Sequence, residues 1–309
     1  MQRSTQSDVA IFLIALLVAV VLSSIPLYAA DQPGYTLQVT ANEVQLAFAA
    51  SDRDGHVVRA LRSADVAVAD NGSIIRQFRS FQPAAKCPLD LVILLDASDS
   101  VASQIPEEIA TVRNFVGDSA WGQHDRISIL AFGGLRPQLI CARNCEGDIA
   151  ALKLRALRTN GLTPLYDALF QASELLKQNR DAQSRLAIIL FSDGVDTISM
   201  HGLSEVLEAA QNLQATIYSV NSRSGKSAPS QGDTVLNHLA GSTGGLSFAP
   251  GRNNMEVLRT VMEDLRGGYV LTYALPVQAP GQHSVRILPT SDPKLQFRAR
   301  SAYNDAGNE

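Results

Sequence analysis

The sequence predicts an α/β fold: a doubly wound, mostly parallel sheet with helices on both faces, plus a small antiparallel β unit built from N- and C-terminal strands. Two observations predict it. Between residues 87 and 266, short apolar runs alternate with stretches whose apolar residues recur at helical spacing. On either side of this region, apolar and polar residues alternate as in half-exposed strands.

The elements of the central region follow from these patterns. The expected strands cover residues 91–95, 127–132, 138–141, 186–191, 216–220 and 245–249, and the expected helices cover residues 105–117, 164–178, 203–213, 234–240 and 255–265. Pro164 indicates a helix start, because proline fits the first helical position. Residues 221–232 are rich in Ser and Gly, and we expect them to form a surface loop.

Strand-like sequence occupies residues 35–81 and resumes after Gly268. Asp54-Gly55 and Asn71-Gly72 separate the N-terminal runs as hairpin turns do. Because an isolated hairpin is only marginally stable, we expect the two ends to pack together. The expected segments are a signal peptide or signal anchor (1–30), an N-terminal β unit (31–86), an α/β domain (87–266) and C-terminal strands (267–309) that pair with 31–86.

The N-terminus is typical of a secretory signal. Arg3 precedes an apolar run over residues 9–22, and small residues follow at Ala29 and Ala30. The alternative is an uncleaved anchor, since the run and its flank approach the ~20 residues that span a bilayer. We therefore expect a secreted or periplasmic protein, or one anchored in the membrane through this segment alone, facing the periplasm or the exterior.

Charge and cysteine content limit the classes of partner and cross-link. The 309 residues carry a formal net charge of -4, so no basic field favours nucleic acid or an anionic membrane. The three cysteines are Cys87, Cys141 and Cys145, and an odd count leaves at least one unpaired in a monomer. A Cys141–Cys145 bridge and a bridge from Cys87 to that loop both remain open.

Polar side chains gather at what should be one edge of the sheet. One predicted buried strand ends in the run LVILLDASDS, another ends in LAIILFSDG, and a threonine stands directly before the helix expected from residue 164. Ligands of open α/β sheets bind at the carboxyl ends of the strands. Carboxylate and hydroxyl oxygens are ligands that hard divalent cations prefer. The candidate metal ligands are Asp96, Ser98, Ser100, Thr163 and Asp193.

These three segments resemble the metal-ion-dependent adhesion site of the von Willebrand factor type A family, and the resemblance covers about residues 89–266. It implies that the triplet Asp96, Ser98 and Ser100, the loop threonine and the final aspartate hold a cation whose open position takes a carboxylate of a partner protein. Mg²⁺ or Mn²⁺ fits such a partly hydrated site better than Ca²⁺, which is the alternative ion. The flanking strands are arranged similarly to those of acidobacterial-type von Willebrand A-related proteins.

Two further aspartates lie beside the candidate ligands. Asp99 stands where the family often has glycine, and Asp196 follows the last candidate by three residues. We expect both at the surface rather than around the metal. Asp96 alone would be interpreted as a helix N-cap. Its combination with Thr163 and Asp193 favours the metal site.

The resemblance implies an exported, protein-binding module of adhesion type and no enzyme activity. One alternative is a structural exported module with a vestigial metal site. Another is a Mg²⁺-dependent, phosphatase-like enzyme using Asp96, although that chemistry requires a second aspartate where Ser98 stands. The sequence contains no glycine-rich dinucleotide turn after its first α/β strand and no Gly-x-Ser-x-Gly nucleophile elbow.

Overall fold

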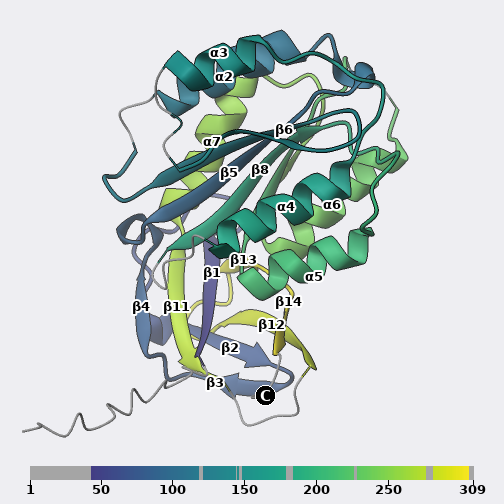
Figure 1. Ribbon diagram of the computed structural model, residues 1–309. Helices are drawn as coiled ribbons and strands as arrows, with labels where there is room; N and C mark the ends of the chain where they lie inside the picture. Colours follow the sequence, from purple (N-terminus) through teal and green to yellow (C-terminus); the bar gives the residue numbers. More distant parts are fainter. Residues whose placement is uncertain are drawn as a thin grey trace, which may run out of the picture. The chain divides into compact units, whose positions relative to one another are not determined.

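The strand that carries the candidate triplet lies in the middle of a six-stranded sheet (Figure 1). The computed structural model describes residues 43–117, 121–143, 145, 148–178, 184–225, 228–275 and 281–305. The strand order is β10 (Ser247–Phe248), β9 (Thr216–Asn221), β8 (Arg185–Ser192), β5 (Leu89–Asp96), β6 (Arg126–Phe132) and β7 (Gln138–Cys141). All neighbours pair in parallel except β7, which runs antiparallel to β6. The predicted fold class is confirmed.

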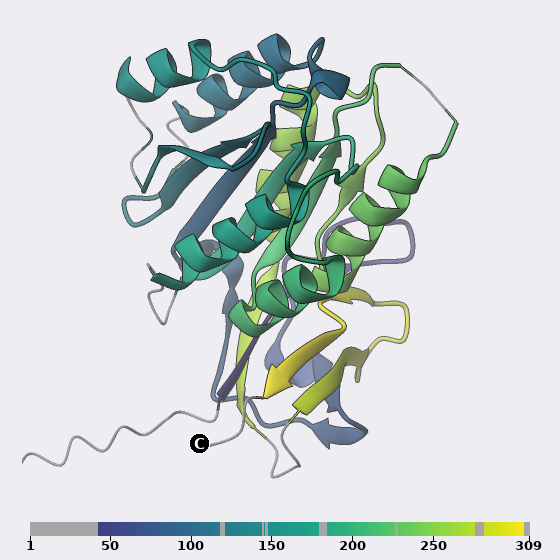
Figure 2. The same ribbon diagram turned by 45° about the vertical axis from the view of Figure 1, so that its right-hand side comes forward.

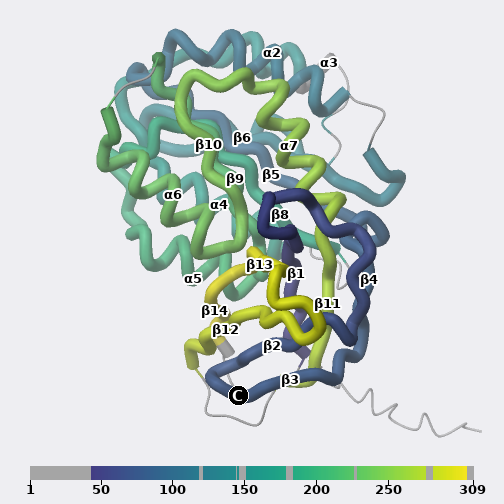
Figure 3. Tube along the Cα trace, turned by 180° about the vertical axis from the view of Figure 1, so that it is seen from behind, coloured from purple at the N-terminus to yellow at the C-terminus, as the bar shows by residue number. Residues whose placement is uncertain are grey.

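Helices cover both faces of this sheet (Figures 1 and 3). One face packs against α2 (Ile105–Val116), α3 (Asp148–Arg155) and α7 (Asn254–Gly267), and the other against α4 (Leu165–Gln178), α5 (Leu203–Leu213) and α6 (Gln231–Thr243). Successive side chains of β5 enter the two cores alternately: Leu91, Ile93 and Leu95 enter the first, Val92 and Leu94 the second. Burial on both faces explains the continuous apolar run in the sequence.

The helix and strand boundaries mostly follow the sequence patterns. The strand at 138–141 and the helix at 203–213 have the predicted bounds. The loop expected over residues 221–232 is wrong at its end, because α6 already begins at Gln231. Ser230 caps this helix: its hydroxyl accepts from the Asp233 amide (3.2 Å), and its own amide donates to the Asp233 carboxylate (2.6 Å). Helix α3 was not expected from the sequence.

Strands from the two ends of the chain pair with each other in two antiparallel sheets. The first has the order β13 (Gln296–Ala299), β1 (Glu43–Ser51), β11 (Tyr269–Ala274), β4 (Ser80–Pro83), and the second has β14 (Ala302–Asp305), β12 (Gly281–Pro289), β2 (Val66–Asp70), β3 (Ser73–Ile75). Glu43 lies opposite Ala274 in the first sheet. Apolar side chains of both sheets form one core. The segment boundaries at 86/87 and 266/267 stay predictions.

Short 3₁₀ helices occupy Ser63–Asp65, Ala84–Lys86 and Asp99–Val101. The last β strand also lies beside the α/β region, since the Asn304 side chain donates to Glu208 of α5 at 2.9 Å (Figure 2). The last strand is therefore in direct contact with a helix of the α/β region.

A buried polar network ties the terminal strands together. The Asp70 carboxylate accepts hydrogen bonds from the hydroxyls of Tyr273 (2.8 Å) and Tyr303 (2.6 Å) and lies 2.8 Å from Nδ1 of His283. All four side chains are buried. Each comes from a different strand: β2, β11, β14 and β12. One carboxylate thus connects strands from both ends of the chain.

The cysteines form one of the two disulfide pairings that the sequence leaves as alternatives. Cys141 and Cys145 form a disulfide, and Cys87 is buried with a free thiol. Among the described residues, no helix has the length and apolar character needed to cross a bilayer. The predicted signal or anchor over residues 1–30 lies outside the described residues.

Candidate metal site

Asp96 ends β5 at the carboxyl edge of the sheet, where its side chain is fully buried. One carboxylate oxygen accepts from the Ser98 amide (2.9 Å), and the other accepts from the Ser192 hydroxyl (2.6 Å). The hydroxyls of Ser98 and Ser100 lie 3.1 Å apart. The chain then turns into the 3₁₀ helix Asp99–Val101. The triplet therefore forms one compact group of oxygen atoms.

The loop that carries Thr163 lies against this triplet. Ser98 and Asn160 form an isolated parallel bridge, and the Asn160 amide donates to the Ala97 carbonyl (2.9 Å). Thr163 is buried two residues before the start of α4. Its amide donates to the Thr197 hydroxyl (2.8 Å), and its carbonyl accepts from the Thr197 amide (3.0 Å). The threonine loop thus joins the triplet to the segment that follows β8.

Asp193 follows β8, the direct neighbour of β5, and is buried. Its carboxylate accepts from the Val195 amide (3.0 Å), which fixes a tight turn. Gly194 has a φ of +80° there, a conformation open to glycine but strained for other residues. The turn packs closely on α6, since a Cβ added to Gly232 would lie 2.1 Å from the Asp193 carbonyl oxygen. The backbone leaves Asp193 little freedom.

The five predicted ligands therefore lie at one edge of the sheet, on three segments joined by hydrogen bonds. The pKa of Asp96 is raised to about 6, because burial and the negative charge of Asp193 together outweigh the lowering effect of hydrogen bonds from Ser192 and Ser98. Each Asp96 oxygen already accepts one hydrogen bond, but a carboxylate has about four lone-pair sites, so capacity for a cation remains. Two buried carboxylates with neutral hydroxyls around them fit a divalent cation. Their role as ligands stays a prediction.

Asp99 and Asp196 are less buried than the two candidate carboxylates, Asp96 and Asp193. Asp99 is exposed at the start of its 3₁₀ helix. Asp196 accepts from the Tyr166 amide (3.3 Å) and from the Ser199 hydroxyl (2.5 Å), so its carboxylate caps the start of α4. Local structure accounts for Asp196 without a metal.

The sequence reasoning missed Glu108, a buried glutamate in α2. It is 2% exposed, and its Oε2 has no hydrogen-bond partner among the described residues. Its pKa is raised to about 7, chiefly by burial and also by the charges of Asp96 and Glu107, against the lowering effect of the Ser222 hydroxyl. A pair of glutamates early in a helix usually faces solvent, so the local sequence gave no signal of this burial.

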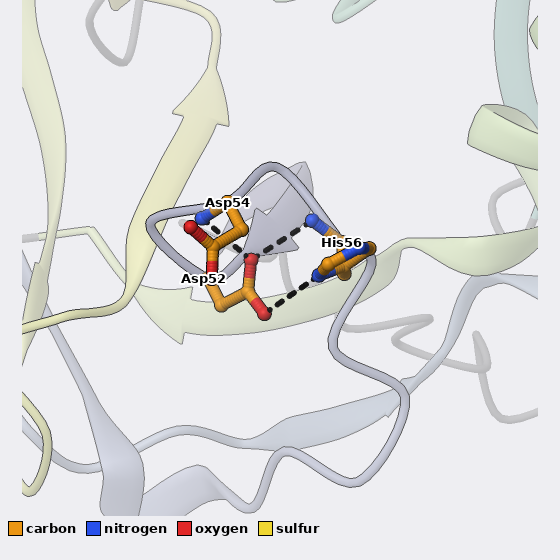
Figure 4. Close-up of side chains that lie close together, drawn as sticks. All are labelled: Asp52, Asp54 and His56. Atoms are coloured by element: carbon orange, nitrogen blue, oxygen red, sulfur yellow. Dashed lines mark hydrogen bonds and ion pairs between the residues drawn. The ribbon is translucent and has the colours of Figure 1, made fainter.

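A second group of ionisable side chains lies in the loop after β1 (Figure 4). Asp52, Asp54 and His56 are close enough to share an ion, but Asp54 and His56 are exposed. One Asp52 oxygen accepts from the amides of both other residues (2.9 Å each), and the second lies 3.2 Å from Nδ1 of His56. These hydrogen bonds are those of an ordinary aspartate-capped turn, and they account for the cluster. It is separate from the predicted metal site.

Comparisons with known proteins support the family resemblance. Residues 91–195 match the family model of the von Willebrand factor type A domain. No curated protein shows significant similarity to the chain.

Solved structures with a similar fold include three proteins of low sequence identity. An aerotolerance-related membrane protein from Bacteroides fragilis is 14% identical, with 57% of this chain and 98% of that chain covered and a TM-score of 0.42. The protein BatB from Bacteroides thetaiotaomicron is 15% identical, with the same coverage and a TM-score of 0.44. The manganese-loaded TRAP protein of Plasmodium vivax is 16% identical, with 77% and 98% covered and a TM-score of 0.43. The family match covers residues 91–195, about a third of the chain, and every one of these TM-scores lies below 0.5.

Proposed function

We propose, from the match of residues 91–195 to the family model of the von Willebrand factor type A domain, that the chain is a non-enzymatic protein-binding module that uses a divalent cation to bind a carboxylate of its partner. The ligands proposed are Asp96, Ser98, Ser100, Thr163 and Asp193. Mg²⁺ or Mn²⁺ is the proposed ion.

The observation that supports the proposal best is the burial of two carboxylates beside neutral hydroxyls. Asp96 and Asp193 are 0% and 6% exposed, and neither forms an ion pair with a basic side chain among the described residues. Two buried negative charges without a cationic partner are costly, and a bound cation offsets that cost. Because the remaining donors are uncharged, such a cation keeps the ability to attract a further, external carboxylate.

The proposed setting is outside the cytoplasm. The apolar run at residues 9–22 behind Arg3 supports export, either with cleavage or with retention as an anchor. The Cys141–Cys145 disulfide agrees with an oxidising compartment.

The test is a titration of the purified protein with Mn²⁺ or Mg²⁺ by calorimetry, with Asp96→Asn and Asp99→Asn as matched variants. Both changes remove one negative charge in the same loop, but only Asp96 is a proposed ligand. We expect wild type and Asp99→Asn to bind one ion, and Asp96→Asn to lose about 100-fold or more in affinity. A melting temperature that rises with metal in the first two proteins alone gives an independent readout.

Equal ion affinity in wild type and Asp96→Asn would contradict the proposal. The absence of any ion binding would favour the structural module with a vestigial site. Metal-dependent hydrolysis of a generic phosphoester that disappears in Asp96→Asn would instead favour the phosphatase-like alternative.

A further inference from the structure

A pocket of about 520 Å³ adjoins the predicted metal site. It lies between the edge strand β7, helix α3 and the loop that leads to Thr163. Ala97 and Asn160 line it. Ala97 is the residue between Asp96 and Ser98, and its carbonyl accepts the Asn160 amide. The backbone of the metal-ligand loop is therefore one wall of this pocket, which we term the basic pocket.

Two cationic side chains line the basic pocket, Lys153 and Arg158. Lys153 donates to the carbonyl of Ile140 (3.0 Å), and Arg158 donates to carbonyls of its own turn, including that of Leu157 (3.1 Å). Neither side chain forms an ion pair with an acidic group in the part of the chain that the structure describes. Both are exposed and able to bind an anion.

The sequence around the basic pocket has a net charge opposite in sign to that of the whole chain. Residues 133–163 contain five Lys and Arg against two Asp and Glu, a formal charge of +3, whereas the chain carries -4. A local positive field beside a cation site favours ligands that carry more than one negative charge.

We propose that the basic pocket holds a second carboxylate of the partner, so that the ligand is an extended acidic segment with one carboxylate on the metal and another beside Lys153 and Arg158. This inference rests on the proposed function. Leu139 and Leu157 also line the pocket, so it offers apolar contacts to the chain that links the two carboxylates. A volume of this size accommodates a few residues of such a segment.

The test uses glutamine-rich peptides, acetylated and amidated, with one glutamate or with two glutamates at spacings of one to five residues. Binding to the full chain is measured by fluorescence polarisation with saturating Mn²⁺ and with chelator. The test variant is Lys153→Gln with Arg158→Gln. The matched control is Arg155→Gln, an exposed cation of the same segment that does not line the pocket.

At the best spacing we expect the second glutamate to tighten binding about five- to twentyfold in wild type and in Arg155→Gln, the gain of two partly exposed ion pairs. The double variant should lose this gain but keep its affinity for Mn²⁺ and for the peptide with one glutamate. A gain that is absent at every spacing, or that Arg155→Gln loses equally, would overturn the inference.

The chelator arm separates this inference from the proposed function. If peptides bind equally with and without metal while the gain still depends on Lys153 and Arg158, the pocket stands and the proposed function fails. If binding requires metal but the double variant behaves as wild type, the proposed function stands and the pocket inference is wrong. Tighter binding of inorganic phosphate than of any peptide, abolished in the double variant, would assign the pocket to a small anion and also refute it.

Discussion

Replacement of the buried glutamate of α2 should stabilise the protein at neutral pH. Glu108 is 2% exposed, and its pKa is raised from 4.5 to about 7, chiefly by burial. Between these two pH values the folded protein holds this proton while the unfolded chain releases it. The free energy of unfolding therefore falls as the pH rises through this window. Above pH 7 the contribution of Glu108 to the free energy of unfolding changes no further.

The size of the effect follows from the two pKa values. At about 1.4 kcal/mol for each pH unit, the charge on Glu108 costs about 3 kcal/mol above pH 7 and nothing below pH 4.5. Glutamine has nearly the same shape and no charge. The stability difference between Glu108→Gln and wild type should therefore grow from near zero at pH 4.5 to about 3 kcal/mol at pH 8.

Urea denaturation of both proteins between pH 4.5 and 8, with chelator present, measures this difference directly. Glu107→Gln, the neighbouring glutamate that is not buried, serves as the control and should show no comparable growth with pH. A difference between Glu108→Gln and wild type that stays constant across the range would refute the reasoning. With saturating Mn²⁺ the growth should shrink, because a cation at Asp96 favours the charged form of Glu108.

Three further substitutions test the packing described above. Gly232→Ala should cost about 1–3 kcal/mol and weaken Mn²⁺ affinity, because its Cβ would overlap the Asp193 carbonyl; a calorimetric titration matching wild type would contradict this. Replacing both Cys141 and Cys145 by serine should cost about 2 kcal/mol in urea denaturation, as expected for a cross-link spanning four residues, and an unchanged midpoint would argue against the bridge. Tyr303→Phe removes a hydrogen bond to a buried carboxylate and should cost about 1.5–3 kcal/mol in the same assay, whereas a loss below 0.5 kcal/mol would show the bond to be unimportant.

The sequence predicted the inner strands of the central sheet because they are buried on both faces. Strand β5 reads as a continuous apolar run, and its neighbours do the same, so their positions required no knowledge of tertiary contacts. Helix α6 began earlier than expected. Gly232 suggested a loop, but the reciprocal bonds between Ser230 and Asp233 stabilise the first turn.

The candidate site likewise contains residues that the sequence could predict and residues that it could not. The Asp-x-Ser-x-Ser triplet and the aspartate after β8 can be recognised because each directly follows an apolar run that local sequence identifies as a strand. Glu108 and the basic pocket cannot, since both depend on where α2 and α3 pack on the sheet. Burial that arises from contacts between distant elements has no local signature.

The pairing of the chain's two ends constrains the order in which the protein can fold. Strand β1 hydrogen-bonds to β11 and β13, and Glu43 meets Ala274 only after more than two hundred intervening residues exist. At about 5–20 residues per second, a nascent chain on the ribosome leaves this first strand without partners for about 10–50 s. The terminal sheets are therefore among the last parts of the protein that can form during synthesis.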